Sequence, residues 1–248
     1  MSNLYKELAT VYEAMYQTFI DYNAEYTLYS NLLKKYQKKQ VLEIGCGTGN
    51  LVPYFLADGF DYIGLDLNEA MITLASNKMP TGKFLQGDMC HFTLAYPVQS
   101  VIITARTISY LLTNQAVNEA FANIHNNLEI GGLLCFDFID ANQFMPIVAK
   151  SDEIVHTATT NQTTYLRKSK WYLNFAYGMG FKWDSIYYKK EGDALIELGQ
   201  DNSNLRTFTR DELTIFLELN GFAIKEFTAR ETYAFPTYVL VAEKVDVK

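Results

Sequence analysis

The chain has 248 residues, 49% of them hydrophobic, which suffices for one large domain or for a domain that carries a substantial insertion. Its formal net charge of −7 disfavours nucleic acid as a partner, because nucleic-acid binding rewards clustered Lys and Arg. No apolar run approaches the roughly 20 residues of a membrane helix, and the first residues lack a secretion signal, so we expect a cytoplasmic protein that does not bind membranes.

The first 138 residues alternate between helical and strand-like patterns. From Leu4 to Tyr36, apolar and aromatic residues recur at three- and four-residue steps, which predicts helix. Short apolar runs then predict strands at Val41–Ile44, Tyr62–Leu65, Lys83–Gln86, Val98–Thr104 and Gly132–Phe138. Helical patterns lie between these runs at Leu51–Ala57, Glu69–Ser76 and Asn114–Asn127. This alternation predicts an α/β fold, with a mainly parallel sheet covered by helices on both faces.

The character of the sequence changes after about Ala141. Residues 154–200 are rich in Thr, Tyr and Trp and alternate with a period of two around a turn at Glu191-Gly192-Asp193, which predicts an antiparallel β insertion. Thr209 then precedes Glu212 by three residues, as in a capping box, and Gly221 is placed to end that helix. The closing strands are predicted at Phe222–Phe227 and Tyr238–Glu243. We therefore expect a main domain over residues 1–145 and 206–248 and an inserted β subdomain over residues 146–205.

A glycine-rich loop, Gly45 to Gly49, follows the first predicted strand and opens a helix. Glycines let the backbone approach a ligand closely, and the helix N-terminus adds oriented N–H groups. The third glycine comes one residue earlier than in the dinucleotide fingerprint GxGxxG, with Asn50 in its place. This spacing disfavours NAD, although the loop alone does not distinguish a nucleotide site from a tight turn.

Acidic residues end the next two predicted strands. Asp66 is placed to accept hydrogen bonds from both hydroxyls of a ribose, although capping of the following helix is an alternative role. Asp88 suits the exocyclic amine of an adenine, with Leu67 and Met89 as apolar walls, although a turn carboxylate is the alternative. Ligands of open α/β sheets bind at the carboxyl ends of strands, where both residues fall.

Three segments together resemble a known family. VLEIGCGTGN, GLDLNEAMITLA and LQGDM look like the first three signature motifs of the class I S-adenosylmethionine-dependent methyltransferases. The resemblance extends from Val41 to about Phe138 and implies a Rossmann-like, seven-stranded sheet with one antiparallel strand. The opening YKELATVYE, residues 5–13, further resembles the YxxLAxxYD start of a small-molecule branch with a β lid inserted after the fifth strand, with Glu13 where Asp is usual.

The resemblance also implies roles for matching residues. The glycine loop would hold the methionine end of S-adenosylmethionine, Glu43 would support that loop from behind, Asp66 would bind the ribose, and Asp88 with Met89 would bind the adenine. The expected cofactor-binding residues are Tyr12, Glu43, Gly45, Cys46, Gly47, Gly49, Asp66, Leu67, Asp88, Met89 and Thr104.

The methyl acceptor is less well defined by the sequence. The Asn/Asp-Pro-Pro-aromatic signature of nucleobase amino methylation is absent, and ITARTISYL stands there instead. Arg106 is a candidate for binding an acidic substrate or for a structural salt bridge, and Tyr110 for an acceptor wall or a core aromatic. The insertion adds Trp171, Tyr177 and Trp183, which suit either the substrate or the core of the insertion. No residue is assigned as a catalytic base.

These observations predict an enzyme that methylates a small molecule, on nitrogen or oxygen. The alternatives are a non-catalytic protein that binds S-adenosylmethionine or S-adenosylhomocysteine, and a methyltransferase acting on protein or RNA. Cys46, Cys90 and Cys135 lack CxxC spacing, so we expect neither a metal site nor a disulfide. The protein is expected to be a monomer or a homodimer.

Overall fold

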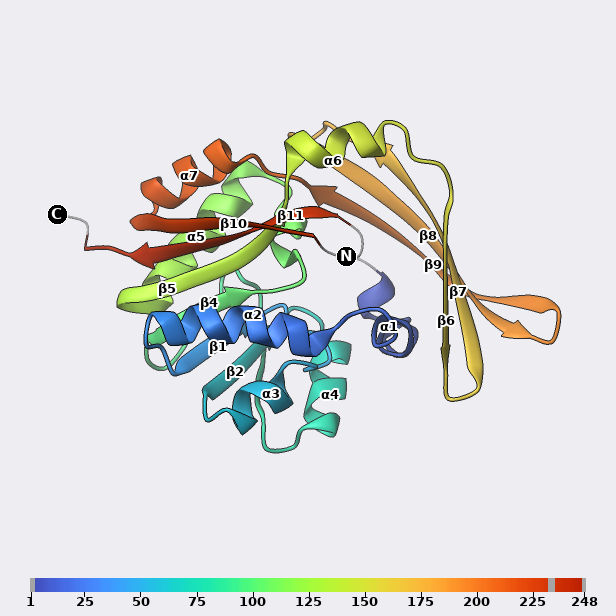
Figure 1. Cartoon of the computed structure of the whole chain (residues 1–248), viewed down its shortest axis with the longest axis horizontal. Coiled ribbons are helices and arrows are strands. Elements are labelled where there is room, and N and C mark those ends of the chain that lie inside the picture. The colour runs from blue at the N-terminus through green and yellow to red at the C-terminus, as the bar shows by residue number, and fades with distance from the viewer. Residues whose placement is uncertain (1–2, 232–234, 247–248) are drawn as a thin grey trace.

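The computed structural model describes residues 3–231 and 235–246. Figure 1 shows the main sheet with the helices that pack on it at the left and a long, curved antiparallel sheet at the right. The helices are η1 (Asn3–Tyr5), α1 (Ala9–Tyr16), α2 (Tyr22–Lys35), α3 (Val52–Ala57), α4 (Glu69–Lys78), η2 (Thr107–Tyr110), α5 (Asn114–Asn127), α6 (Ala141–Val148) and α7 (Arg210–Leu219). The strands are β1 (Gln40–Ile44), β2 (Asp61–Asp66), β3 (Lys83–Gln86), β4 (Val98–Ile103), β5 (Leu128–Ile139), β6 (Ile154–Thr160), β7 (Thr163–Leu173), β8 (Gly180–Glu191), β9 (Ala194–Arg206), β10 (Phe222–Glu231) and β11 (Pro236–Lys244).

The main sheet has the strand order β10-β11-β5-β4-β1-β2-β3. Its strands β1 to β5 pair in parallel, whereas β11 runs antiparallel to both β5 and β10. The expected seven-stranded sheet with one antiparallel strand is therefore confirmed. Chain order reverses between β1 and β4, so the loops after these two strands diverge and leave room for a ligand between them.

Alternate residues of the central strands serve two separate cores, one on each face of the main sheet. Val101 and Ile103 face the core beneath α5 and α7, whereas Ile102 between them faces the core beneath α2 and α3. This alternation is the period of two that a strand imposes. Helices thus cover both faces, as predicted.

The second sheet contains four antiparallel strands in the order β6-β7-β8-β9. The predicted turn at Gly192 and Asp193 joins β8 to β9, and Gly192 takes the left-handed φ of 60°. Asn161 and Gln162 join β6 to β7 as a two-residue hairpin loop. Their φ values of 48° and 62° are both positive, as in a type I′ turn. We call this sheet the lid sheet.

Two helical features differ from the sequence-based expectation. The N-terminal helical pattern is not one helix, because the chain turns after Tyr16 and Asp21 starts α2 afresh by accepting a hydrogen bond from the Ala24 N–H at 2.9 Å. Helix α6 was not predicted. It follows β5 directly, and its buried Phe144 packs against the lid residues Trp171 and Phe181.

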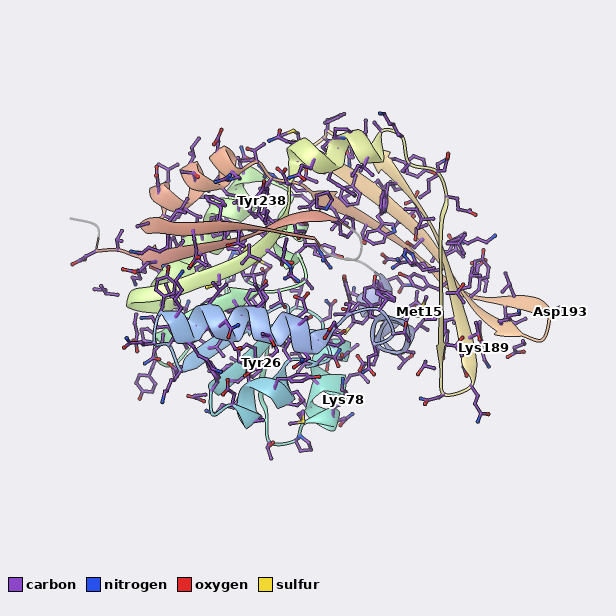
Figure 2. The ribbon with its side chains drawn as sticks, viewed as in Figure 1. Met15, Tyr26, Lys78, Lys189, Asp193 and Tyr238 are labelled. Carbon is purple, nitrogen blue, oxygen red and sulfur yellow. The ribbon has the colours of Figure 1, made fainter. Side chains whose placement is uncertain are left out.

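The N-terminal segment, residues 3–20, packs on the lid sheet. Leu8, Met15 and Tyr16 form a buried cluster with Ala158 and Tyr187 of the lid. Figure 2 shows Met15 on α1 between the two sheets, whereas Asp193 marks the outer end of the β8–β9 hairpin. Among the described residues, no helix is both long and apolar enough to cross a membrane.

Candidate active site

The glycine loop begins where β1 leaves the sheet. The N–H groups of Gly45 and Cys46 both donate to the Leu65 carbonyl of β2, at 2.8 and 3.1 Å. Gly45 has a φ of 76°, and a Cβ there would lie 2.4 Å from the Thr107 Oγ1, so only glycine fits. Gly47 has a φ of 53°, and a Cβ there would point into open space. The loop therefore presents bare backbone to the space above the sheet.

Asp66 ends β2 with its carboxylate tied to that loop. Its Oδ2 accepts from the Gly47 N–H at 3.0 Å, and its Oδ1 accepts from the Asn68 N–H at 2.9 Å. Burial raises the pKa of Asp66, and these two backbone N–H groups partly offset the rise. Each carboxylate oxygen keeps further acceptor capacity, so the group can also receive ligand hydroxyls.

Glu43 lies below the loop, on β1. Its carboxylate accepts hydrogen bonds from the Tyr62 hydroxyl and, at 2.7 Å, from the Thr104 hydroxyl. Burial raises the pKa of Glu43 to about 7. Two hydroxyl donors, from β2 and from the residue after β4, thus hold this carboxyl beside the glycine loop.

Helix α1 is fastened to the glycine loop by Glu13. The Glu13 carboxylate accepts from the Thr48 hydroxyl, and the Lys78 ammonium of α4 lies 2.5 Å from it. Lys78 also donates to the Asn50 side-chain oxygen at 2.6 Å. The Glu that replaces the usual Asp therefore connects the N-terminal segment, the loop and α4.

A cavity of about 450 Å³ opens above the carboxyl ends of β1 and β2. One part of its lining consists of the predicted ligand residues Asp66, Leu67, Asp88 and Met89, together with Gly45, Gly47 and Tyr12. Another part comes from elsewhere in the fold and includes Tyr5, Tyr110, Leu111, Leu112 and residues Asn202 to Asn204 of β9. The cavity thus runs from the main sheet to the N-terminal segment and the edge of the lid sheet.

A smaller cavity of about 50 Å³ adjoins the first and shares Tyr12, Gly45, Gly47 and Ala105 with it. It is lined by Glu25, Glu43, Cys46, Thr104 and Arg106, among others. Burial raises the pKa of Asp137, and the neighbouring Arg106 guanidinium partly offsets that rise. This cavity combines carboxylates and a guanidinium, a set complementary to an amino-acid zwitterion.

Most of the predicted site residues line one of the two cavities, and a few do not. All expected cofactor residues except Gly49 line one of these cavities; Gly49 instead packs against Ala75 and Phe84, where a Cβ would lie 3.2–3.3 Å from both side chains. Among the expected substrate residues, Tyr110 lines the large cavity and Arg106 the small one.

Three aromatic residues of the insertion line neither cavity. Trp171 is buried against Phe144 and Phe235, and Trp183 packs beside it with the Arg167 guanidinium 5.0 Å from its ring centroid. Tyr177 lies in the exposed connection between β7 and β8. Both tryptophans therefore belong to the apolar core that the second sheet needs for itself.

Several cavity residues were not anticipated from the sequence. Tyr5 belongs to the YxxLAxxYD resemblance, and Cys90 directly follows the Asp88-Met89 motif, so both had a nearby signal. Asn202 and Asn204 had none, because β9 carries no motif and reaches the cavity only through the packing of the lid sheet.

Known proteins with similar sequences are methyltransferases. A methyltransferase-domain family model matches residues 41–132. A putative methyltransferase of a Geobacillus species is 26% identical, and the match covers 87% of this chain and 88% of that protein. A dTDP-3-amino-3,4,6-trideoxy-α-D-glucopyranose N,N-dimethyltransferase of Streptomyces venezuelae is 31% identical, over 46% of this chain and 49% of that enzyme.

Solved structures share the whole architecture. An S-adenosylmethionine-dependent methyltransferase from Clostridium acetobutylicum aligns with a TM-score of 0.78 at 13% identity, over 98% of this chain and all of the other. CalS10, an amino pentose methyltransferase from Micromonospora echinaspora with S-adenosylmethionine bound, aligns with a TM-score of 0.76 at 22% identity, over 95% and 97% of the two chains. The matched family model, the sheet order and the motif residues around the cavity together identify an S-adenosylmethionine-dependent methyltransferase domain in this chain.

Proposed function

We propose that this methyltransferase transfers the methyl group of S-adenosylmethionine to an amine of a small, hydroxylated molecule of the amino-sugar class. The observation that carries the proposal is the single cavity that joins the Asp66 and Asp88 half to the half lined by Tyr110 and β9. The named activities of the relatives support the choice of acceptor, since they include an amino-sugar N,N-dimethyltransferase, an amino pentose methyltransferase and a sugar N-methyltransferase.

The residues that line the two cavities fit the cofactor. Open space at the Gly47 Cα leaves the loop backbone accessible to a ligand. We assign the ribose to Asp66, the adenine to Asp88 with Leu67 and Met89, and the methionine end to the small cavity. There Arg106 suits the cofactor's carboxylate better than an acidic acceptor, because it lies beside the glycine loop rather than in the half that contains Tyr110.

S-adenosylmethionine supplies a methyl group that its sulfonium already activates. The task of the protein is therefore to hold the acceptor nitrogen in line with that methyl group and to exclude water, and positioning of this kind is worth roughly 7–11 kcal/mol. The N-terminal segment and β9 line the part of the cavity that contains Tyr110, which we call the acceptor half, and they are placed to hold the acceptor and to exclude water.

A methylation assay tests the proposal. Purified protein is incubated with S-adenosylmethionine and either amino sugars, the same sugars with hydroxyl in place of the amine, phenols or carboxylic acids. We expect release of S-adenosylhomocysteine and a mass increase of one methyl group with the amino sugars. Binding of S-adenosylmethionine without transfer to any acceptor would instead favour the non-catalytic alternative.

The cofactor assignment has its own variant. We expect Asp66→Ala to weaken S-adenosylmethionine binding about tenfold or more by calorimetry, because charge-assisted hydrogen bonds to the ribose are lost. Asp61→Ala is the matched control, since Asp61 lies at the other end of β2 and pairs with Lys83. Unchanged affinity in Asp66→Ala would remove the ribose assignment.

A further inference from the structure

The acceptor half of the large cavity contains two pairs of polar side chains to which no cofactor contact is assigned. One set is the hydroxyl pair of Tyr5 and Tyr110. The other is the amide pair of Asn202 and Asn204 on β9. Of the described residues that line this cavity, the charged ones are Asp66 and Asp88 in the cofactor half, so the acceptor half offers neutral hydrogen-bonding groups.

The tyrosine pair joins two distant parts of the chain. The hydroxyls of Tyr5 in η1 and Tyr110 in η2 lie 2.8 Å apart, and their rings meet edge to face at a centroid distance of 5.8 Å. Burial raises the pKa of Tyr5 well above its usual range, so this hydroxyl stays protonated. The oxygen of a tyrosine hydroxyl also carries lone pairs that can accept an N–H.

The amide pair lies on the last strand of the lid sheet. Asn202 and Asn204 are exposed to the cavity, whereas Asp201, Ser203 and Leu205 beside them are buried. Strand geometry places residues two apart on one face, about 7 Å from each other, a spacing that lets the two amides contact different groups of one sugar-sized molecule.

The strand is held in place by bonds that do not occupy the two amides fully. The Asp201 carboxylate accepts from the Leu4 N–H at 3.0 Å and from the Ser203 hydroxyl at 2.9 Å. The Asn204 oxygen accepts from the Asn174 side chain at 2.9 Å. That bond fixes the Asn204 amide through its oxygen, so its NH₂ group can donate to a ligand.

We infer that Tyr5, Tyr110, Asn202 and Asn204 form an acceptor subsite for an amine that carries a hydroxyl on a neighbouring carbon. The inference rests on the proposed function and adds to it the residues that set acceptor specificity. The tyrosine oxygens accept the N–H groups of the amine and so orient its lone pair. Asn204 donates to the neighbouring hydroxyl, and Asn202 contacts the next polar group along the acceptor.

Binding to the complex with S-adenosylhomocysteine tests the subsite without turnover. The probes are trans-2-aminocyclohexanol and cyclohexylamine, which differ by one hydroxyl, and their affinities are measured by NMR titration. We expect the wild type to prefer the amino alcohol about tenfold, the worth of one well-formed hydrogen bond. Asn204→Ala should abolish most of this preference and leave S-adenosylhomocysteine affinity unchanged, whereas Asn77→Ala, at an exposed position of α4, should change neither.

Tyr110→Phe separates the two halves of the inference. It should weaken both amines to a similar degree and retain the preference for the hydroxyl. Equal wild-type affinity for the two probes, or a preference that survives Asn204→Ala, would overturn the subsite.

The methylation assay is scored separately from binding. Amines that bind with the hydroxyl preference but receive no methyl group would refute the proposed function and leave the subsite standing. Amines that are methylated but bind with no hydroxyl preference would refute the subsite and support the proposed function.

Discussion

Glu43 shows how a residue placed for a ligand affects stability. Its carboxyl is buried beneath the glycine loop, and burial raises its pKa to about 7. Between the unfolded pKa of 4.5 and this value, the folded protein binds the proton more tightly than the unfolded chain does. Stability therefore falls as the pH rises through this window, by about 3 kcal/mol in total.

Glu43→Gln should remove this dependence. We expect its free energy of unfolding, relative to wild type, to increase from pH 5 to pH 8 by about 3 kcal/mol, because an amide has no proton to lose. Urea unfolding at several pH values measures the difference. Glu129→Gln, at an exposed position of β5, should run parallel to the wild type, and a parallel curve for Glu43→Gln as well would contradict the burial argument.

The residues that the sequence identified share one physical property. Gly45, Asp66 and Asp88 each lie at or just after the carboxyl end of a parallel strand, and such ends can be recognised from the local pattern of apolar residues. Asn202 and Asn204 lack that property, because they lie inside the long strand β9, where the sequence carries no local mark of what lies opposite. Tertiary packing alone brings them to the cavity.

At the scale of the element, α7 illustrates a predicted cap that formed in part. The Thr209 hydroxyl accepts from the Glu212 N–H at 3.1 Å, as a capping box requires. The Glu212 carboxylate does not complete the box. It pairs instead with Arg206, whose guanidinium also donates to the Leu112 carbonyl at 3.2 Å. Glu212 thus helps to anchor the end of β9 beside the segment that follows η2.

Thr209→Ala should lower the free energy of unfolding by about 1 kcal/mol, the usual worth of an N-cap, and leave S-adenosylmethionine affinity unchanged. Thr214→Ala is the matched control on the same helix, since its hydroxyl donates to the Arg210 carbonyl at an exposed site. We expect that control to be neutral or slightly stabilising. Equal losses in both variants, measured by urea unfolding, would show that the cap contributes nothing.

The interrupted N-terminal helix follows from competition between periodicity and capping. Apolar residues recur through Phe19 and Tyr22, so the pattern by itself extends without a break. Asp21 supplies a strong N-cap, and the turn before it lets α1 cover the lid sheet while α2 covers the main sheet. Each helix buries its apolar face against a different partner, which one straight helix does not permit.

At the scale of the whole molecule, α1 links the two sheets. Its Glu13 contacts the glycine loop and α4, whereas its Met15 and Tyr16 pack on the lid (Figure 2). Arg167 of the lid donates to the Tyr16 hydroxyl at 2.8 Å. Changes in the packing of α1 are therefore expected to reach both the lid and the cofactor.

Met15→Ala tests this link. Met15 is 1% exposed, and truncation of such a buried side chain costs about 2–5 kcal/mol. We expect faster hydrogen exchange in residues 4–16 and in β6, little change in β1 and β4, and weaker S-adenosylmethionine binding through Tyr12. Glu7→Ala, at an exposed position of the same segment, is the control. Uniformly faster exchange across both sheets would show that the molecule opens as one unit.

The sequence by itself determined the class of fold, the methyl donor and the strand ends that line its cavity, because periodicity, turn glycines and carboxylates after strands are local features. The tertiary structure alone decided that both lid tryptophans serve its core, that α6 bridges the two sheets, and that Tyr5 and β9 border the cavity with Tyr110. These outcomes depend on which apolar faces meet. That packing brings together residues nearly 200 positions apart, such as Leu4 and Asp201, which share a hydrogen bond, and no local pattern encodes such contacts.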